Sequence, residues 1–207
     1  FCVSKIAIPP QITSTTLMEE KDFELINWLK AILPEEELDR IHDRISRKPD
    51  RITKGYQELL SGYNIKDASE ILAVTEEIPN KDYSGLVSAL SVPFLSFCEH
   101  HFLPFIGTID LVYEPNDIIL GIGKLSRLID YRTQRFNIQE NIARQLCEDI
   151  TKFGKAKGAF ARVSAQHMCA CYRGPKKYNA TNNVTFSMGS CNDSKMIYQI
   201  QTILNSK

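Results

Sequence analysis

Histidine and cysteine are sparse in this 207-residue chain, yet they gather in two short segments. The segments Cys98-Glu99-His100-His101 and His167-Met168-Cys169 contain three of the four histidines and two of the six cysteines. Thiolate and imidazole are the ligands that zinc prefers, and a catalytic zinc site typically takes three protein ligands and leaves the fourth position to water. Cys98, one adjacent histidine and Cys169 would fit such a site.

The first segment does not by itself select a histidine. On an extended chain Cys98 and His100 share a face, whereas in a turn Cys98 and His101 converge. The spacing therefore leaves both histidines as candidate ligands.

The second segment is expected to lie on a strand, where every second side chain faces the same way. One face would then offer imidazole, thiol and guanidinium groups together: His167, Cys169, Cys171 and Arg173. Two alternatives stand beside a catalytic metal site. The cysteines and histidines could simply be buried, as isolated ones often are, or Cys171 could be a fourth ligand and close a structural zinc site.

Basic residues near these segments indicate an anion site. Lys124 and Arg127 begin a predicted helix just after Gly121 and Gly123, and Arg173 follows the second segment. Backbone N–H groups at a helix start, with basic side chains beside them, can bind phosphate. A solvated basic face is the simpler alternative.

The segments must be positioned by a mixed set of elements. Helices are predicted at 22–32, 35–45, 50–61, 124–133, 138–153 and 193–204. Strands are predicted at 85–97, 105–113, 159–172 and 184–188. This order favours an α+β fold with an antiparallel sheet. We interpret 1–20 as an irregular arm, 21–70 as an N-terminal helical region and 71–207 as the catalytic domain.

The helix at 138–153 is marked by apolar residues that recur every four positions from Ile138 to Ile150. Asn137 and Glu140 have the spacing of a capping box at its start. Glu140 is therefore either a capping residue or a ligand-binding carboxylate, and these two roles are compatible.

Composition limits the partners. Lys plus Arg and Asp plus Glu both number 25, so the formal net charge is zero and no global field attracts nucleic acid or an anionic membrane. A zinc-dependent nucleic-acid binder is also disfavoured, because no paired Cys-x-x-Cys knuckle is present.

The chain has no apolar run long enough for a membrane span and no signal-peptide pattern at its start. We expect a soluble cytoplasmic protein.

Taken together, these motifs resemble the GTP cyclohydrolase I family, the zinc enzymes that open pteridine and tetrahydrofolate biosynthesis. The match runs from about residue 49 to residue 189, and its motifs occur in order without large gaps. Besides the two segments above, it includes Pro49-Asp50-Arg51-Ile52-Thr53-Lys54, Pro104-Phe105-x-Gly107, Gly121-x-Gly123-Lys124-Leu125-x-Arg127, Gln139-Glu140, and Arg173-Gly174 with Lys177.

The resemblance implies a tunnelling fold, in which helices lie on one face of a four-stranded antiparallel sheet. It also implies a homodecamer with sites between subunits. By matching position, it assigns zinc to Cys98, His101 and Cys169, and proton transfer to His100 and His167.

The resemblance also implies how GTP is held. Glu140, helped by Gln139, would hold the guanine base. Basic side chains would hold the triphosphate: Lys124, Arg127 and Arg173, with Arg51 and Lys54 reaching in from a neighbouring chain. The implied reaction converts GTP and water to 7,8-dihydroneopterin triphosphate and formate.

Five positions depart from the family pattern. Gly123 stands where Ser is usual and Asn141 where Arg is usual, while a stretch usually rich in Ser and Thr contains Ala180, Asn182 and Val184. The lost hydroxyl and guanidinium groups leave two alternatives to GTP cyclohydrolysis. One is a paralogue that acts on a different purine nucleotide, and the other is a non-catalytic purine- or pterin-binding module with structural zinc.

Overall fold

The computed structural model describes residues 25–73 and 83–206 of the chain, which forms two compact units, Phe1–Glu58 and Leu59–Lys207. In the first unit, residues 25–30 are helical and are followed by α2 (Glu35–Arg47) and α3 (Asp50–Leu59). Acidic residues fill the first turn of α2 and basic residues its last turn, which complements the helix dipole. The arm expected at 1–20 lies outside the described residues, and the three-part division of the chain stays a prediction.

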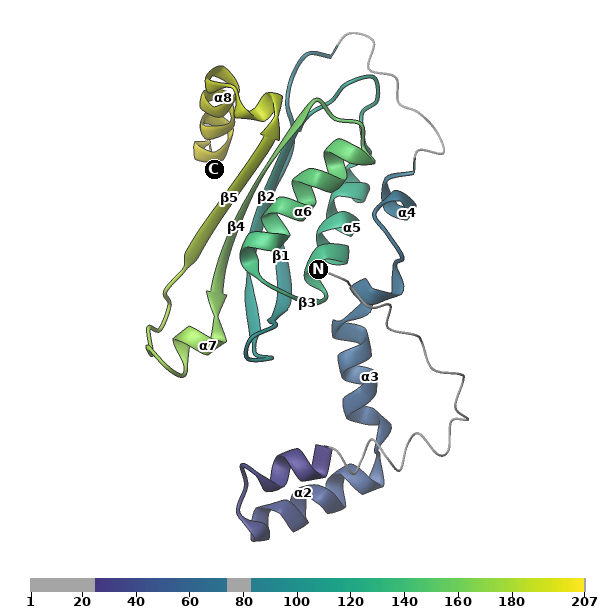
Figure 1. The fold of residues 1–207 in the computed structure, drawn as a ribbon, viewed down its shortest axis with the longest axis vertical. Helices are drawn as coiled ribbons and strands as arrows, with labels where there is room; N and C mark the ends of the chain where they lie inside the picture. The colour runs from purple at the N-terminus through teal and green to yellow at the C-terminus, as the bar shows by residue number, and fades with distance from the viewer. Residues whose placement is uncertain (1–24, 74–82, 207) are drawn as a thin grey trace, which may run out of the picture. The chain divides into compact units, whose positions relative to one another are not determined.

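The second unit is built on a five-stranded sheet with the order β3-β1-β2-β4-β5 (Figure 1). Its strands are β1 (Val87–Cys98), β2 (Pro104–Glu114), β3 (Phe136–Asn137), β4 (Gly158–His167) and β5 (Asn182–Gly189). The four long strands pair antiparallel, and the two-residue β3 runs parallel to β1 at one edge. The predicted α+β fold with an antiparallel sheet is confirmed, and β3 is an addition to it.

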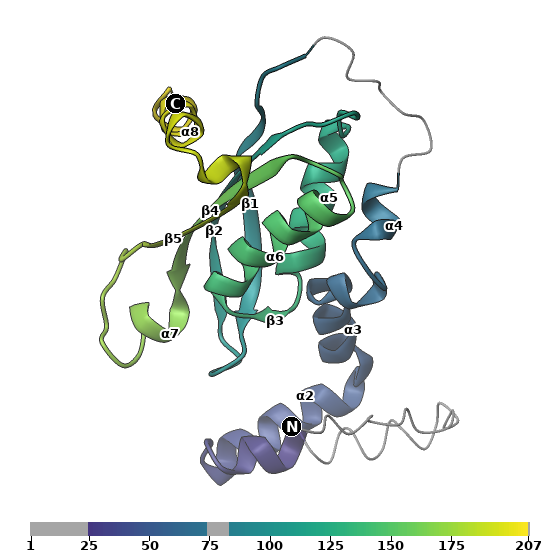
Figure 2. The same cartoon turned by 45° about the horizontal axis from the view of Figure 1, so that its top comes forward.

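Two helices, α5 (Ile122–Thr133) and α6 (Gln139–Lys152), cover one face of this sheet (Figure 2). Alternate residues of β2 and β4 point toward them and are fully buried, among them Ile109, Leu111 and Val163. The apolar four-residue repeat of α6 packs against this layer through Ile142 and Leu146. Burial of each large apolar side chain contributes about 1.5–3 kcal/mol, so this layer is the main core of the unit.

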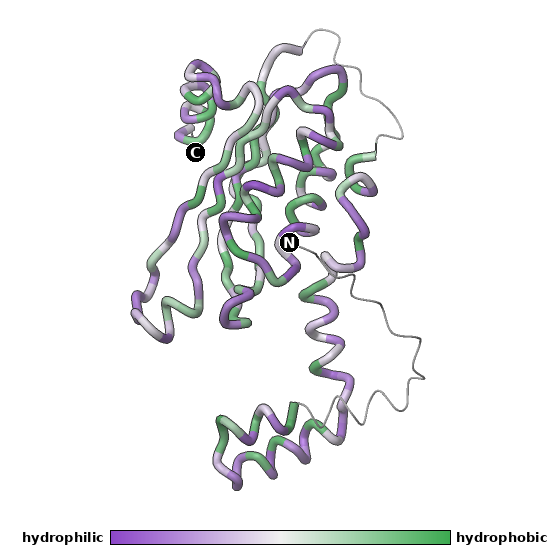
Figure 3. The backbone as a smooth tube through the Cα atoms, viewed as in Figure 1, coloured by the Kyte–Doolittle hydropathy of each residue, from purple (hydrophilic) through white to green (hydrophobic). Residues whose placement is uncertain are grey.

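The opposite face of the sheet is covered in part by α8 (Ser194–Asn205). Ile200 and Leu204 of α8 pack with Val112 and Phe160, whose side chains leave the sheet on the side away from α5 and α6. In Figure 3 the α8 trace alternates between hydrophobic and hydrophilic residues, as expected for a helix with one packed face.

Shorter elements complete the unit: η1 (Ser61–Asn64), α4 (Ser69–Leu72), α7 (Met168–Cys171) and η2 (Ser190–Asn192). No helix within 25–73 or 83–206 combines the length and apolarity of a membrane span.

The strand predicted at 159–172 is wrong in its last third. β4 ends at His167, and the next four residues form the helical turn α7, in which the Tyr172 amide donates to the Met168 carbonyl at 3.2 Å. The last β2 partner of β4 is Phe105, opposite His167. The residue before it, Pro104, has no N–H to continue the ladder, so the chain leaves the sheet there.

Gly107 fixes how closely β2 and β4 approach. A Cβ atom at this position would lie 1.9 Å from the Ser164 carbonyl oxygen and 2.8 Å from Ala165 Cα. Only glycine therefore fits this pairing without moving one of the strands.

An ion pair between Arg132 and Asp149 joins α5 to α6. The guanidinium donates two hydrogen bonds to the carboxylate, at 2.6 and 2.7 Å, and the two side chains are only 18% and 5% exposed. Because the pair is bidentate, both oxygens of the buried carboxylate have a partner.

We expect Asp149→Ala to lower the free energy of unfolding by about 3–5 kcal/mol, because the Arg132 charge stays buried without its partner. Urea denaturation measures the change. The matched control is Glu148→Ala on the same helix, which removes an exposed pair with Arg144 and should cost about 0–1 kcal/mol. Equal losses in the two variants would contradict a special role for the buried pair.

Candidate active site and metal centre

Cys98 is the last residue of β1 and lies beside Asn137 of β3. The chain turns immediately after it, and the turn is closed by the Phe102 amide donating to the Cys98 carbonyl at 2.8 Å and by the Cys98 amide donating to the Leu103 carbonyl at 2.9 Å. The side chain is buried. The backbone thus holds this thiol firmly at one end of the sheet.

His167 ends β4 at the same end of the sheet, and Cys169 follows it in α7. One ligand atom from each of Cys98, His167 and Cys169 lies within 4.8 Å of the other two. Within 25–73 and 83–206, these three residues form the group that could hold a metal ion. The two thiols and the imidazole are donors that suit zinc.

The two exposed histidines of the turn also approach Cys98. The Cys98 Sγ lies 3.7 Å from His100 Nδ1 and 4.0 Å from His101 Nδ1. The turn therefore brings both expected candidates to the thiol. The ligand set that the resemblance implies, with His101 as the nitrogen donor, stays a prediction, because His167 rather than His101 completes the compact three-residue group.

The imidazole of His167 is held on two sides. Its ring stacks on the buried Phe105 ring, with centroids 4.5 Å apart and planes within 2° of parallel. Its Nε2 lies 2.9 Å from the amide oxygen of Gln139. Burial lowers the pKa of His167, and the negative charge of Glu140 opposes this shift.

Cys169 is shaped by its neighbours as well. Burial, and next the adjacent Cys98 thiol, raises the pKa of Cys169, while the positive charge of Arg173 opposes the rise. Metal binding to such a thiol releases its proton, so affinity for the metal falls at low pH. Arg173 is exposed and lies just after α7, which places it near the cluster.

Glu140 is exposed in the first turn of α6. The helix begins at Gln139 with Ile138 as its N-cap and no side-chain capping bond, and the Asn137 side chain instead accepts from the Ile138 amide. The predicted capping box is therefore wrong. The Glu140 carboxylate remains available to a ligand and interacts electrostatically with His167.

Two of the predicted phosphate-binding residues, Lys124 and Arg127, lie in the N-terminal half of α5, whereas its C-terminal end leads to this cluster. Lys124, in the first turn of α5, donates through Nζ to the carbonyls of Ile71 and Ala73, and Arg127 donates to the Gly123 carbonyl at 3.1 Å. The last turn of α5 leads to β3 beside Cys98. At 1.5 Å per residue, Lys124 stands about 14 Å of helix away from that end.

The other two predicted basic contacts, Arg51 and Lys54, belong to α3 in the first unit. Both side chains are exposed, and Lys54 Nζ lies 3.3 Å from the Asp50 carboxylate. Their part in the site stays a prediction.

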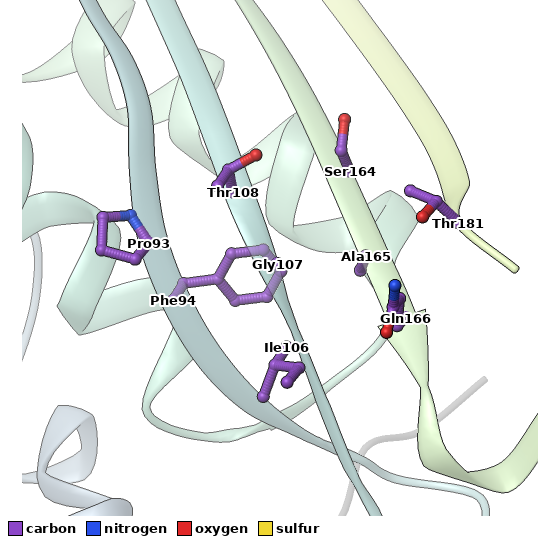
Figure 4. A pocket seen from close by; sticks show the side chains of 9 residues that line it. All are labelled: Pro93, Phe94, Ile106, Gly107, Thr108, Ser164, Ala165, Gln166 and Thr181. Carbon is purple, nitrogen blue, oxygen red and sulfur yellow. The ribbon is translucent and has the colours of Figure 1, made fainter. Parts of the chain in front are cut away.

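A hollow of about 490 Å³ lies on the sheet where β1, β2 and β4 run side by side (Figure 4). Its lining is neutral and consists of Pro93, Phe94, Ile106, Gly107, Thr108, Ser164, Ala165, Gln166 and Thr181. These residues offer neither a charge to hold phosphate nor the thiol and imidazole donors that zinc prefers. The cluster, and not this hollow, therefore has the donors that a zinc site needs.

Sequence analysis missed the two contacts that hold His167. Phe105 is 62 positions away in sequence and Gln139 is 28 positions away, so neither contact follows from local spacing. The register of β2 with β4 places Phe105 opposite His167, and only the fold reveals it.

The comparisons with known proteins agree with these features. The family model for GTP cyclohydrolase I matches residues 26–204. GTP cyclohydrolase 1 of Rickettsia felis (strain ATCC VR-1525 / URRWXCal2) is 36% identical over 151 residues, which cover 73% of this chain and 78% of the relative. GTP cyclohydrolase 1 of Allorhizobium ampelinum is 35% identical over 142 residues, which cover 68% and 69%.

A solved structure, the apo form of the archaeosine synthase QueF-Like, overlaps 53% of this chain and 98% of its own. Its TM-score of 0.42 and 16% identity are too low to carry a conclusion. Sheet, cluster and family match together define an α+β enzyme with a thiol–imidazole site. The chain belongs to the GTP cyclohydrolase I family.

We expect the protein to bind one zinc or cobalt(II) ion per chain and to lose it in the Cys98→Ala and Cys169→Ala variants. Cobalt(II) absorption, with its thiolate charge-transfer bands, and metal analysis after dialysis measure this. Cys171→Ala is the matched control, because Cys171 lies in the same short helix but outside the three-residue group. Loss of metal in the control would instead favour the closed structural site with four ligands.

Proposed function

We propose that the chain catalyses the conversion of GTP and water to 7,8-dihydroneopterin triphosphate and formate. The observation that carries this proposal is the cluster of Cys98 and Cys169 with His167 at one end of the sheet, next to the free carboxylate of Glu140. Membership of the GTP cyclohydrolase I family supports it.

The proposed metal is zinc, and its proposed ligands are Cys98, His101 and Cys169. The donor set fits, because two thiols and the nearby imidazoles are soft and borderline ligands that zinc prefers. Zinc, when bound, supplies a Lewis acid that lowers the pKa of a coordinated water to about 7. The burial of Cys98 and the backbone hydrogen bonds around it support its assignment as one of these ligands.

His100 and His167 are the proposed proton-transfer groups. A histidine that titrates near neutrality can protonate a purine ring nitrogen as the ring opens and can assist the second hydrolysis that releases formate. The His167 ring is fixed by Phe105 and Gln139, so its position is set before substrate binds. His100 is exposed in the turn, and its Nδ1 lies 3.7 Å from the Cys98 thiol.

Glu140 is the proposed guanine contact. A carboxylate that faces the N1–H and 2-amino groups of guanine accepts two charge-assisted hydrogen bonds. Adenine lacks this donor pair, so such a site rejects it strongly.

Two copies of the chain are proposed to complete the triphosphate site. Arg173 is close enough to Cys169 to affect the pKa of its thiol. Lys124, in contrast, lies in the first turn of α5, and Arg127 lies near the middle of that helix. We propose that a neighbouring copy brings its own Lys124 and Arg127, together with Arg51 and Lys54, to the site. A homodecamer of the family type satisfies this requirement.

We expect zinc-loaded protein incubated with GTP to release formate and, after oxidation, a fluorescent pterin. His100→Gln should lower kcat by roughly 10²–10⁴-fold, the contribution usual for a general acid or base. Absence of both products at high enzyme concentration would overturn the proposed activity.

The guanine contact is tested with inosine triphosphate, which lacks the 2-amino group. We expect Glu140→Gln to lower kcat/KM for GTP by roughly 10²-fold, in line with about 1.5–3 kcal/mol for a hydrogen bond to a charged group. The variant should lose much less with inosine triphosphate, because one of the paired contacts is already missing. Equal losses for both substrates would contradict the paired contact. Turnover of another purine nucleotide in preference to GTP would favour the paralogue alternative.

The proposed roles of His101 as a zinc ligand and of His167 as a proton-transfer group can be tested separately. His101→Gln should weaken zinc binding, whereas His167→Gln should keep zinc and lose turnover, and dialysis against a graded zinc buffer measures the affinity of each variant. The reverse pattern would make His167 the nitrogen ligand.

A further inference from the structure

Gln139 makes a set of contacts that the proposed role in guanine binding does not use. The side chain is only 3% exposed. Its Nε2 donates to the Val163 carbonyl at 2.7 Å and to the Asn182 carbonyl at 3.0 Å, and its Oε1 lies 2.9 Å from His167 Nε2. Both amide hydrogens are thus committed to the backbone of β4 and β5.

These partners determine which way the amide of Gln139 is turned. A carboxamide carries two donor hydrogens on nitrogen and only acceptor lone pairs on oxygen. If the group were reversed, Oε1 would face the carbonyl oxygens of Val163 and Asn182, and three acceptors would meet without a hydrogen. Only the orientation with Nε2 toward the two carbonyls satisfies all of these buried groups.

The orientation of Gln139 in turn determines where His167 carries its proton. Oε1 cannot donate, so the hydrogen between Oε1 and His167 Nε2 belongs to the imidazole. A neutral His167 is therefore protonated at Nε2 and has its lone pair at Nδ1.

We infer that Gln139 is a positioning residue that holds the single ring hydrogen of neutral His167 on Nε2 and so leaves Nδ1 as the ring nitrogen with a free lone pair. This inference rests on the proposed function for its consequence in catalysis, but the hydrogen bond itself does not. It assigns Gln139 to His167 rather than to guanine. Stacking on Phe105 fixes the plane of the imidazole ring. The hydrogen bond to Gln139 fixes which ring nitrogen, Nε2, carries the hydrogen.

The hydrogen bond is tested in zinc-free protein labelled with ¹⁵N-histidine. Magic-angle-spinning NMR, which is not limited by assembly size, reports which ring nitrogen is protonated and how fast its hydrogen exchanges with water. Loss of signals in His167→Gln assigns them. In the wild-type protein at alkaline pH we expect a protonated Nε2 that exchanges slowly. A lone pair at Nε2 would overturn the inference without any variant of Gln139.

Two substitutions of Gln139 test whether the slow exchange depends on its acceptor oxygen or on the rest of its side chain. Gln139→Met keeps the length but removes the acceptor, and we expect the His167 Nε2 hydrogen to exchange at least about tenfold faster. Gln139→Glu keeps an acceptor oxygen toward His167, and protonation of its other oxygen supplies one donor toward the Val163 and Asn182 carbonyls, so this variant should retain slow exchange. Gln145→Met is the matched control, because Gln145 lies on the same helix and accepts from Asn137 instead. If the His167 Nε2 hydrogen exchanges in Gln139→Met at the wild-type rate, the inference is contradicted. If Gln139→Met fails to fold, fast exchange of this hydrogen in Gln139→Glu contradicts it instead.

Kinetics then distinguish positioning from substrate binding. We expect Gln139→Met to lower kcat for GTP by roughly 10–100-fold, because a proton-transfer group that has lost its orientation gives up part of its roughly 10²–10⁴-fold contribution, with KM within about twofold of wild type. Gln139→Glu should restore part of kcat, and Gln145→Met should change neither constant. A raised KM with unchanged kcat would make Gln139 a substrate contact. If the wild-type protein releases no formate from GTP, the proposed function is wrong, while the exchange measurements still decide the hydrogen bond.

Discussion

The pairing of β2 with its two neighbours is the constraint on which the site depends. Strands β1 and β4 both run antiparallel to β2, so both end where β2 begins. Phe105, near the start of β2, lies opposite Ser96 of β1 and His167 of β4. The thiol at the end of one strand and the imidazole at the end of the other meet because this single strand sets the register of both. A slip of one residue would turn one of these side chains to the other face.

Much of this arrangement could be predicted from the sequence, because its signals are local. The apolar repeat from Ile138 to Ile150 identified α6, and runs of β-branched and aromatic residues identified the four long strands. The crowding of cysteine and histidine identified the residues that the fold brings together. Local patterns failed where a long-range partner decides the outcome, as at the end of β4, where the missing N–H of Pro104 stops the ladder. The same limit hid the contacts of Gln139, whose side-chain amide donates to carbonyls of two different strands.

The sequence also could not show that the basic residues occupy separate places. Lys124, Arg127 and Arg173 look like one group when each is assigned to the triphosphate. The described chain instead puts Lys124 at the start of α5, bonded to carbonyls beside α4, and Arg173 next to the thiols. The proposal that a second copy of the chain supplies Lys124 and Arg127 to the triphosphate site rests on this separation.

Gly107 has no reactive side chain, yet its packing controls the position of His167, which has one. The residue contacts no ligand candidate, yet a single added methyl group would collide with the backbone of β4 three residues before His167. Any adjustment that relieves this collision must shift β4 against β2 and carry the imidazole with it. The position of His167 is therefore set in part by a residue outside the site, and a second substitution that restores it would be sought in β4, where the collision occurs.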